Sequence, residues 1–413
     1  MKRNAVITGL GIVSPIGTGV EKFWKAACLG QSGIRKLTQF DGSQSPRECQ
    51  IVGEVPDFRA EEWMPGRAGK MAGRFSQFAV ASTKMALSDT HLDLNKIDPN
   101  RIHVMIGTST NGLRDVYDSN FVAFLGGGEA KPWGALEYPA HSATSHVGIL
   151  IGARGRMSTF ATACAAGLDA IGWAAEAIQR NEATVVLAGA TETPLSAFLL
   201  EAFRAVGVLS KWPGPPAEAS RPFDKLRAGL VLAEGAAVVV MEEEEHARVR
   251  RAPMYARILG FANSSEGSHL RKVDESGASD ARTMTLALMQ AGLFPRNVDY
   301  ISAHGNSMVD YDAAETAGIK LAFGRHAWNI PVSSLKSMLG QSLAASGAMQ
   351  VVGACLTLRD GIVPPTINYQ VPDPSCDLDY VPNVARRVRV RTLLIHAHSM
   401  GGSHSAMVLT KPD

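Results

Sequence analysis

Short apolar runs alternate with longer amphipathic stretches along the chain, and no other feature constrains the possible fold as strongly. The apolar runs, predicted to be strands, cover residues 102–106, 184–188, 236–241, 300–303 and 392–395. The stretches with helical spacing cover residues 75–89, 164–181 and 283–291. Because apolar strands that alternate with helices are typical of sheets covered on both faces, the pattern predicts an α/β fold with buried sheets.

The composition is that of an ordinary globular protein and argues against several classes of protein. The chain has 413 residues, 46% of them hydrophobic, which suffices for a sizeable core. Lys and Arg number 41 against 39 Asp and Glu, without a basic tail, so nothing indicates nucleic-acid or membrane-surface binding. No apolar run has the length of a membrane span. Five scattered cysteines lack the spacing of a disulfide scaffold or a zinc site, which favours a reducing cytoplasm.

The N-terminal segment is predicted to be a buried strand over residues 5–10, followed by a turn. Gly, Ser and Pro residues interrupt the apolar run that a secretory signal would need. Gly9 and Gly11 resemble the start of a dinucleotide-binding fingerprint, but Ser14 stands at the third glycine position and Pro15 follows it. A phosphate-binding role is therefore not expected here.

The segment 245–260 is the predicted seam between two halves of the chain. It passes from a strand through a charged helix to Pro253. The expected division is therefore into residues 1–250 and 251–413.

Cys164 is the candidate nucleophile. It lies in Thr162-Ala163-Cys164-Ala165-Ala166-Gly167, a turn of small residues before a helical pattern. Small neighbours would leave the sulfur uncovered, and the positive potential of a helix start would favour the thiolate. A free cysteine is more often packed as a small buried hydrophobe, so the other segments must decide between the two interpretations.

Two further segments carry polar residues in an apolar setting. His304 follows a predicted strand in Ser302-Ala303-His304-Gly305-Asn306, where it would be exposed enough to meet a ligand. Lys336 stands among small and apolar residues in Ser333-Ser334-Leu335-Lys336-Ser337-Met338, which indicates that it is partly buried and paired, with Glu315 as a candidate partner.

Together these segments resemble the elongating β-ketoacyl-acyl-carrier-protein synthases, and the resemblance covers essentially the whole chain. The further motifs that carry it are Ala5-Val6-Ile7-Thr8-Gly9-Leu10-Gly11, Ser220-Arg221-Pro222-Phe223-Asp224, Ala233-Glu234-Gly235 and Gly401-Gly402. The resemblance implies a thiolase-like fold, with two similar halves in a five-layered α-β-α-β-α sandwich. It also implies a dimer, of this chain with itself or with a homologous subunit.

The same resemblance implies a reaction and a role for each residue. Cys164 would take an acyl chain from a phosphopantetheine thioester, and the N–H groups of Cys164 and Met400 would form the oxyanion hole. His304 would donate to the thioester oxygen while a malonyl unit loses CO₂. Lys336 and Glu315 would hold His304 in place. The substrates would be acyl and malonyl thioesters of an acidic acyl carrier protein, with no bound cofactor and no metal, and Lys70, Arg74 and Arg204 are candidate docking residues.

Several residues near this site depart from the family pattern. Gln341 replaces the second catalytic His, and Asn306 and Met308 replace threonines that touch the pantetheine arm. The gating loop reads His398-Ser399-Met400-Gly401-Gly402 instead of Phe-Gly-Phe-Gly-Gly, and His404 replaces an Asn. Gln341 can donate an N–H to an enolate but cannot carry a proton. We therefore expect that the His398 imidazole reaches into the pocket and replaces the missing one, so that His398→Ala damages activity almost as much as His304→Ala.

Alternatives remain open at this point. His396, His398 and His404 have the tight spacing of metal ligands, but no carboxylate or Cys lies near them in sequence, and the resemblance carries no metal there. The leading function is a ketosynthase of specialised polyketide or fatty-acid metabolism. The second is an acyltransferase or thioesterase that uses Cys164 and His304 without decarboxylation. The third is a partner subunit like the chain-length factors.

Overall fold

The computed structural model describes residues 3–116, 121–129 and 132–412, which form an 11-stranded mixed sheet with helices on both sides of it. The strands of the N-terminal half are, in spatial order, β6 (Met157–Phe160), β5 (Ile102–Gly107), β7 (Val185–Glu192), β8 (Gly235–Glu243) and β1 (Ala5–Ser14). Those of the C-terminal half are β11 (Val332–Ser333), β10 (Tyr300–Ser302), β14 (Thr392–His398), β15 (Ser403–Thr410) and β9 (Ala256–Ser265). The short β2 (Gly17–Thr18) pairs with β1.

The two halves repeat one topology. In the N-terminal half, β5 pairs in parallel with the edge strand β6 and with β7, and the pairs β7–β8 and β8–β1 are antiparallel. In the C-terminal half, β10 pairs in parallel with the edge strand β11 and with β14, and the pairs β14–β15 and β15–β9 are antiparallel. The halves are joined where β1 pairs antiparallel with β9, from Ala5 opposite Ile258 to Ile7 opposite Ala256. The sequence shows no clear repeat, because the pairing pattern depends on apolar character and not on residue identity.

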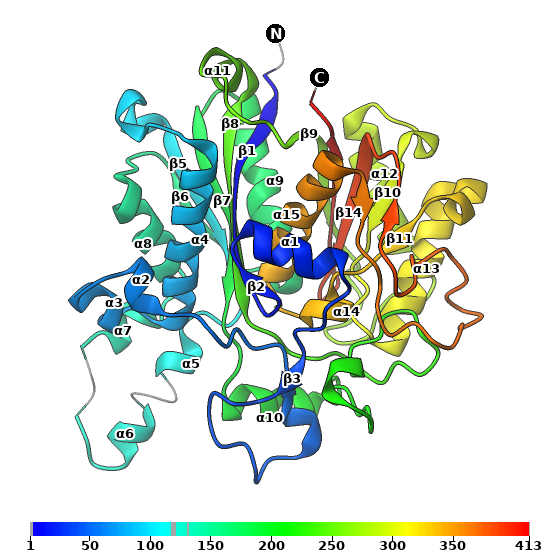
Figure 1. The fold of residues 1–413 in the computed structure, drawn as a ribbon, viewed down its shortest axis with the longest axis horizontal. Helices are drawn as coiled ribbons and strands as arrows, with labels where there is room; N and C mark the ends of the chain where they lie inside the picture. Colours follow the sequence, from blue (N-terminus) through cyan, green and yellow to red (C-terminus); the bar gives the residue numbers. More distant parts are fainter. Residues whose placement is uncertain (1–2, 117–120, 130–131, 413) are drawn as a thin grey trace.

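The helices form three layers around the two half-sheets, as Figure 1 shows. The outer helices of the N-terminal half are α4 (Arg74–Thr90) and α8 (Ser142–Ile151), and those of the C-terminal half are α12 (Ala278–Ala291) and α13 (Val309–Phe323). Between the half-sheets lie α9 (Ala166–Gln179) and α15 (Ala345–Asp360), and both contact strands of the two halves. This is the five-layered, thiolase-like arrangement expected from the sequence.

The central layer is possible because its helices are built from small residues. A Cβ on Gly167 would lie 2.5 Å from the Ala344 carbonyl oxygen, so glycine lets α9 approach the start of α15. Gly11 has a similar role in β1, where a Cβ would lie 1.9 Å from the Ser82 oxygen of α4. The Gly9-Leu10-Gly11 segment therefore serves helix–sheet packing inside a strand.

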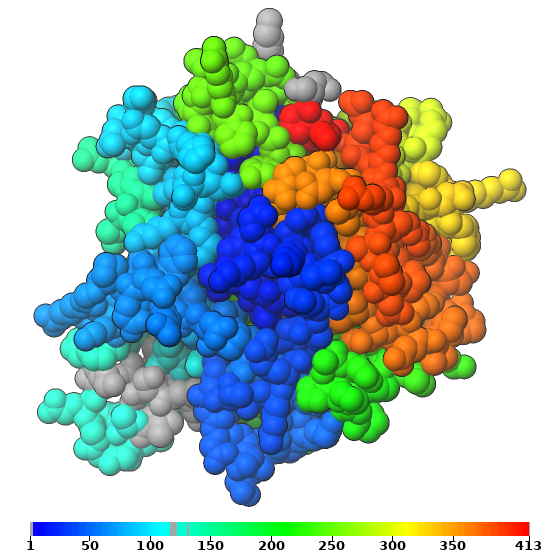
Figure 2. All heavy atoms as spheres, in the orientation of Figure 1, coloured from blue at the N-terminus to red at the C-terminus, as the bar shows by residue number. Residues whose placement is uncertain are grey.

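The remaining elements are short or lie over the surface. They are α1 (Val20–Cys28), α2 (Ala60–Trp63), α3 (Arg67–Met71), α5 (Leu113–Val116), α6 (Val122–Leu125), α7 (Gly134–Glu137), α10 (Ala197–Val206), α11 (Glu244–Val249), α14 (Lys336–Leu339), and the pairs β3 (Arg35–Lys36) with β4 (Ile51–Val52) and β12 (Ile362–Val363) with β13 (Arg386–Arg387). In Figure 2 the N-terminal segment covers the middle of one face, between the two halves. Among the described helices, none is long and apolar enough to cross a membrane.

The structure corrects several predicted boundaries. The first strand continues past residue 10 to Ser14, because Gly11 fits against α4 without ending the pairing with β8. The helix predicted from residue 164 begins at Ala166, and Ala163–Ala165 form a 3-10 turn instead. Helix α12 begins at Ala278, five residues before the prediction, because its polar first turn carries a buried carboxylate, Asp280, that hydropathy does not reveal.

Candidate active site

The turn that carries Cys164 is fixed by a residue from the other half of the chain. The Ala165 N–H donates to the Ser399 hydroxyl (2.9 Å), and that hydroxyl donates to the Thr162 carbonyl oxygen (2.9 Å). Ala163 has φ of 49°, a left-handed conformation that is uncommon for residues other than glycine. A backbone held in such a conformation beside a candidate nucleophile is typical of functional sites.

Cys164 is buried, with 5% of its surface exposed, so the expectation of an uncovered sulfur is wrong. Its neighbours in one apolar cluster include Val208, Met308 and Leu343. Burial raises the pKa of the Cys164 thiol to about 11, against the opposing effects of the Lys336 charge and the Gln341 amide. The helix start therefore does not give a resting thiolate, because desolvation outweighs the favourable local charges.

The raised pKa predicts how the Cys164 thiol reacts with pH. Between pH 6 and 8 the thiolate fraction of a group with pKa about 11 rises about tenfold per pH unit, so alkylation by iodoacetamide should accelerate by the same factor. Burial lowers the pKa of Lys336 to about 8, so loss of its charge should flatten this dependence above that pH. Peptide mass spectrometry of Cys164 measures the rate. A plateau near pH 7 would instead show a stabilised thiolate.

His304 follows β10 and is held as a neutral donor. Its backbone N–H donates to Glu315 Oε1 (2.6 Å), and its Nδ1 accepts from the His398 N–H (3.2 Å). Burial, and next the charge of Lys336, lower the pKa of His304 well below its ordinary value. Because Nδ1 accepts a hydrogen bond, the proton of the neutral ring belongs on Nε2, which can donate it to a substrate oxygen.

Asn306 and Met308 lie next to this donor. The Asn306 Nδ2 is 3.1 Å from His304 Nε2, and its Oδ1 accepts from the Met308 N–H (3.0 Å). The amide therefore stands in front of the His304 donor. Because Nδ2 is itself a donor and cannot accept the Nε2 proton, that proton stays available to a ligand oxygen.

Lys336 and Glu315 both support the His304 segment but do not form the direct ion pair expected from the sequence. Lys336 Nζ donates to the His304 carbonyl oxygen (2.6 Å) and lies 3.3 Å from Gln350 Oε1. Glu315 accepts from the N–H groups of His304 and Gly305 (2.6 and 2.8 Å) and binds His396 Nδ1 (2.7 Å). The two residues therefore fix opposite ends of the same backbone unit.

Gln341 lies beside the nucleophile. Its Oε1 accepts from the Ser346 hydroxyl (2.9 Å), and the side chain is close enough to Cys164 to lower the pKa of the thiol. Apart from its interaction with Cys164, the Gln341 Nε2 has no hydrogen-bond partner in the part of the chain that the structure describes. It is a buried, oriented donor at the place where the sequence predicts a catalytic group.

The gating loop presents its backbone, and not the His398 imidazole, to the site. The His398 ring lies 3.9 Å from that of His404 between centroids and 6.0 Å from that of His304. Its nitrogens are near Glu266 and Asp280 instead of the nucleophile. Met400 packs against the cluster that contains Cys164. The ring of His398 is therefore not placed to replace the missing catalytic imidazole.

Three buried polar residues near the site were not found from the sequence. Glu192, at the end of β7, accepts from the N–H groups of Ser109 and Thr110 (2.7 and 2.9 Å), and its charge acts on the Cys164 thiol. Gln350 bridges Lys336 to the end of β10, and the Tyr311 ring lies 4.6 Å from that of His398 between centroids. For each of them, only the fold shows what the polar atom contacts.

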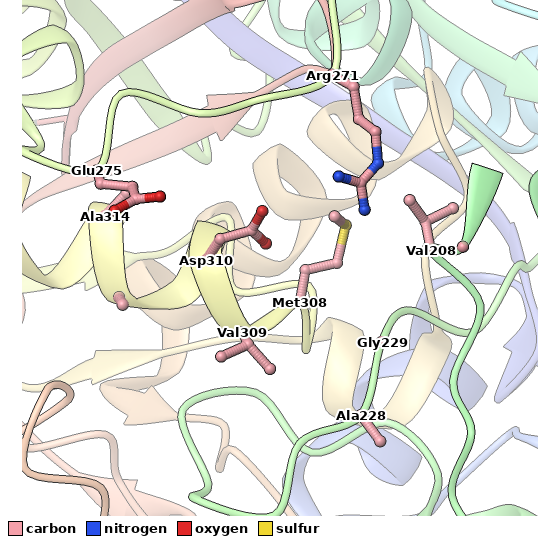
Figure 3. A pocket seen from close by; sticks show the side chains of 11 residues that line it. Val208, Ala228, Gly229, Arg271, Glu275, Met308, Val309, Asp310 and Ala314 are labelled. Carbon is pink, nitrogen blue, oxygen red and sulfur yellow. The ribbon is translucent and has the colours of Figure 1, made fainter.

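A pocket of about 570 Å³ leads to this region (Figure 3). Met308 and Val208 line it and also belong to the cluster around Cys164, and Arg271 and Asp310 stand around it. Of the expected docking residues, Lys70 is exposed, Arg204 pairs with Glu201, and Arg74 is held by the buried Glu234 (2.7 Å). Arg74 is thus a structural residue.

Comparison with known proteins gives one consistent result. Residues 2–247 match the model for the beta-ketoacyl synthase N-terminal domain, and residues 255–370 match that for the C-terminal domain. The chain is 40% identical to 3-oxoacyl-[acyl-carrier-protein] synthase 2 of Coxiella burnetii, over 99% of both chains. It is 38% identical to the tetracenomycin polyketide synthase ketoacyl synthase alpha subunit of Streptomyces glaucescens, over 100% of this chain and 98% of the relative.

Solved structures agree with these relatives. One is the AntDE:AntF assembly, a type II PKS acyl-carrier protein in complex with its ketosynthase bound to the hexaketide, with a TM-score of 0.92 and 35% identity. Another is the ishigamide ketosynthase/chain length factor, with a TM-score of 0.93 and 30% identity. Both matches cover 100% of this chain and of the other.

Proposed function

The chain belongs to the beta-ketoacyl synthase family, and from this premise we propose that it is a ketosynthase with a Cys-His-Gln site. It condenses a carrier-bound acyl group with malonyl-carrier protein, with loss of CO₂, in polyketide or fatty-acid biosynthesis. The single observation that carries the site assignment is the convergence of Cys164, the neutral donor His304 and the buried Gln341 amide.

In the first half-reaction, Cys164 forms the acyl-enzyme. Its thiolate attacks the carbonyl carbon of the acyl-pantetheine thioester, and the pantetheine sulfur leaves and takes up a proton. The N–H groups of Cys164 and Met400 stabilise the oxyanion between these steps. Within the described residues the Met400 N–H donates no hydrogen bond that would compete with this role.

In the second half-reaction, His304 and Gln341 act on the malonyl thioester. The C–C bond to the carboxylate breaks, CO₂ leaves, and the electron pair forms an enolate whose oxygen accepts from His304 Nε2–H and Gln341 Nε2–H. The enolate carbon then attacks the acyl carbonyl on Cys164, and the thiolate leaves. Lys336 and Glu315 are positioning residues, because they hold the His304 backbone.

The partner and its prosthetic arm follow from the same proposal. An acyl carrier protein delivers its phosphopantetheine arm through the pocket of Figure 3, and the reaction uses no separate cofactor. Arg271 at this pocket and the exposed Lys70 are the basic candidates for docking. Ile149 and Met157, exposed beside the edge strand β6, support a contact with a second copy or a homologous subunit. The five free cysteines support a cytoplasmic location.

A direct test follows both half-reactions in one experiment. The protein is incubated with acyl- and malonyl-carrier thioesters, and intact-mass spectrometry follows Cys164 and the carrier. We expect an acyl adduct on Cys164 and then a β-ketoacyl carrier. The second candidate, an acyltransferase or thioesterase, is favoured by the lack of a second imidazole near Cys164, and it predicts the adduct without decarboxylation.

A third candidate, a partner subunit like the chain-length factors, would give no adduct at all. The oriented Cys164, His304 and Lys336 argue against it, because a purely structural subunit has no chemical need for them.

We also propose that the chain divides into two domains, residues 1–250 and 251–413. The boundary falls between the end of α11 at Val249 and the start of β9 at Ala256, which supports this division.

Met308 is expected to control access to Cys164. It lines the pocket and is buried in the cluster around the thiol, so truncation should open a path for a reagent. We predict that Met308→Ala raises the rate of Cys164 alkylation by N-ethylmaleimide by about tenfold, because reactivity depends on access as well as pKa. Peptide mass spectrometry measures the rate. Met289→Ala, at an exposed methionine of α12, is the matched control and should change nothing.

A further inference from the structure

Three histidines lie together on one face of the β14–β15 pair. His396 and His398 are two residues apart on β14 and share a face, and His404 on β15 is directly opposite His398 in the register. Helix α12 packs over this pair and brings the buried Asp280, while Glu266 follows the end of β9. The fold thus supplies the carboxylates that the sequence does not place near these histidines.

One nitrogen of each histidine faces the same oxygen. The distances to Asp280 Oδ1 are 3.4 Å from His396 Nε2, 3.5 Å from His398 Nδ1 and 3.4 Å from His404 Nδ1. None of these contacts has hydrogen-bond geometry, and within the described residues neither Asp280 oxygen nor any of the three nitrogens has a partner. Polar atoms of four buried side chains therefore lack hydrogen bonds at one point, which is costly for a folded protein.

The separations of His396 Nε2 and His404 Nδ1 from Asp280 Oδ1 are those of ligands around a small metal ion. With bonds of about 2.0–2.1 Å to Zn²⁺, the corners of a tetrahedron are about 3.3 Å apart. A charge-assisted N–H···O hydrogen bond would bring the atoms to about 2.7–2.9 Å instead. No lysine or arginine in the described ranges is paired with Asp280, so its neighbours of possible positive charge are the three histidines.

The far nitrogen of each histidine faces a second carboxylate. His396 Nδ1 is 2.7 Å from Glu315 Oε1, and His404 Nε2 and His398 Nε2 are 3.0 and 3.3 Å from Glu266 Oε1. A histidine that binds a metal usually donates its other N–H to a carboxylate or carbonyl, which fixes the tautomer and the ring. Here all three rings have such a carboxylate on the side away from Asp280.

We propose that Asp280, His396 and His404, whose facing atoms all lie within 4.8 Å of one another, bind one divalent transition-metal ion, Zn²⁺, with His398 beside them. The nitrogen-rich donor set selects zinc over Mg²⁺ or Ca²⁺, which prefer oxygen ligands. The ion is not a reactant. It helps to hold His304 in place, because two residues next to the ion also bond to His304. Glu315 accepts from the His304 N–H, and the His398 N–H donates to His304 Nδ1.

The test measures metal directly in the full-length protein. Elemental analysis of protein purified with added Zn²⁺ should give about one ion per chain, the stoichiometry of a single site. Asp280→Asn and His404→Asn should each lower the bound metal at least about tenfold. His246→Asn is the matched control, because His246 also pairs with a carboxylate, Glu242, outside this cluster, and it should keep the metal.

A second measurement avoids the variants, which could fail to fold. Zinc is removed from wild-type protein with a chelator and Co²⁺ is titrated back. We expect the visible absorption of tetrahedral Co²⁺, saturating at one equivalent, and a melting temperature that falls on chelation and recovers. Protein that takes up neither ion and melts unchanged would overturn the proposal and indicate a protonated imidazole paired with Asp280. Equal metal in wild type and both variants would overturn it too.

Discussion

Cys164→Ala should abolish the acyl-enzyme and lower the rate of condensation by about 10⁴-fold or more, because removal of a covalent nucleophile leaves only binding and the oxyanion donors. Intact-mass spectrometry after incubation with the acyl-carrier thioester measures the adduct, and product analysis measures the rate. The substitution removes one sulfur from a cluster of apolar side chains, so the fold should persist.

Cys28→Ala is the matched control. Cys28 is a second free thiol, partly buried at the end of α1 and outside the site. This variant should acylate and condense like the wild type. If Cys164→Ala protein still accumulated an acyl adduct, the nucleophile would be another residue and the assignment of the site would be wrong.

Gln341→Ala should separate the two half-reactions. Loss of an oriented donor to an enolate costs about a hundredfold or more in rate, whereas acyl transfer loses only the lowering of the Cys164 pKa that Gln341 provides. We therefore expect the acyl adduct to form somewhat more slowly but to full extent, while CO₂ release and the β-ketoacyl product fall about a hundredfold. The two products are measured in the same incubation by carrier mass and by release of labelled CO₂.

Two variants complete this test. Gln341→His places an imidazole where the elongating synthases have one and should retain decarboxylation. Gln31→Ala changes an exposed glutamine and should have no effect. Decarboxylation that is unchanged in Gln341→Ala would show that His304 alone serves the enolate. An equal loss of the acyl adduct would mean that Gln341 acts on Cys164 instead.

Much of the fold could be predicted because it depends on apolar periodicity. The five predicted strands at residues 102–106, 184–188, 236–241, 300–303 and 392–395 are all present, since buried strands are continuous apolar runs. The repeat of one topology in two halves came from the family resemblance alone. It leaves no trace in residue identity, because the same pairing can be built from different side chains.

The sequence predicted which residues form the site, but it did not predict which atoms those residues contact. The motifs identified Cys164, His304, Lys336 and Gln341, but the burial of the thiol depends on packing across both halves. The direction of the His398 ring depends on Asp280 and Glu266, which lie far from it in sequence. Partner choice among buried polar groups is a property of the three-dimensional arrangement, so spacing along the chain could not reveal it.

The two hydrogen bonds of Ser399 connect the gating loop directly to the turn that carries Cys164. Its hydroxyl accepts from the Ala165 N–H and donates to the Thr162 carbonyl, so the gating loop supports the turn that carries Cys164. A movement of the loop that broke these two hydrogen bonds would remove that support. The position of the sulfur therefore depends on the position of the gating loop.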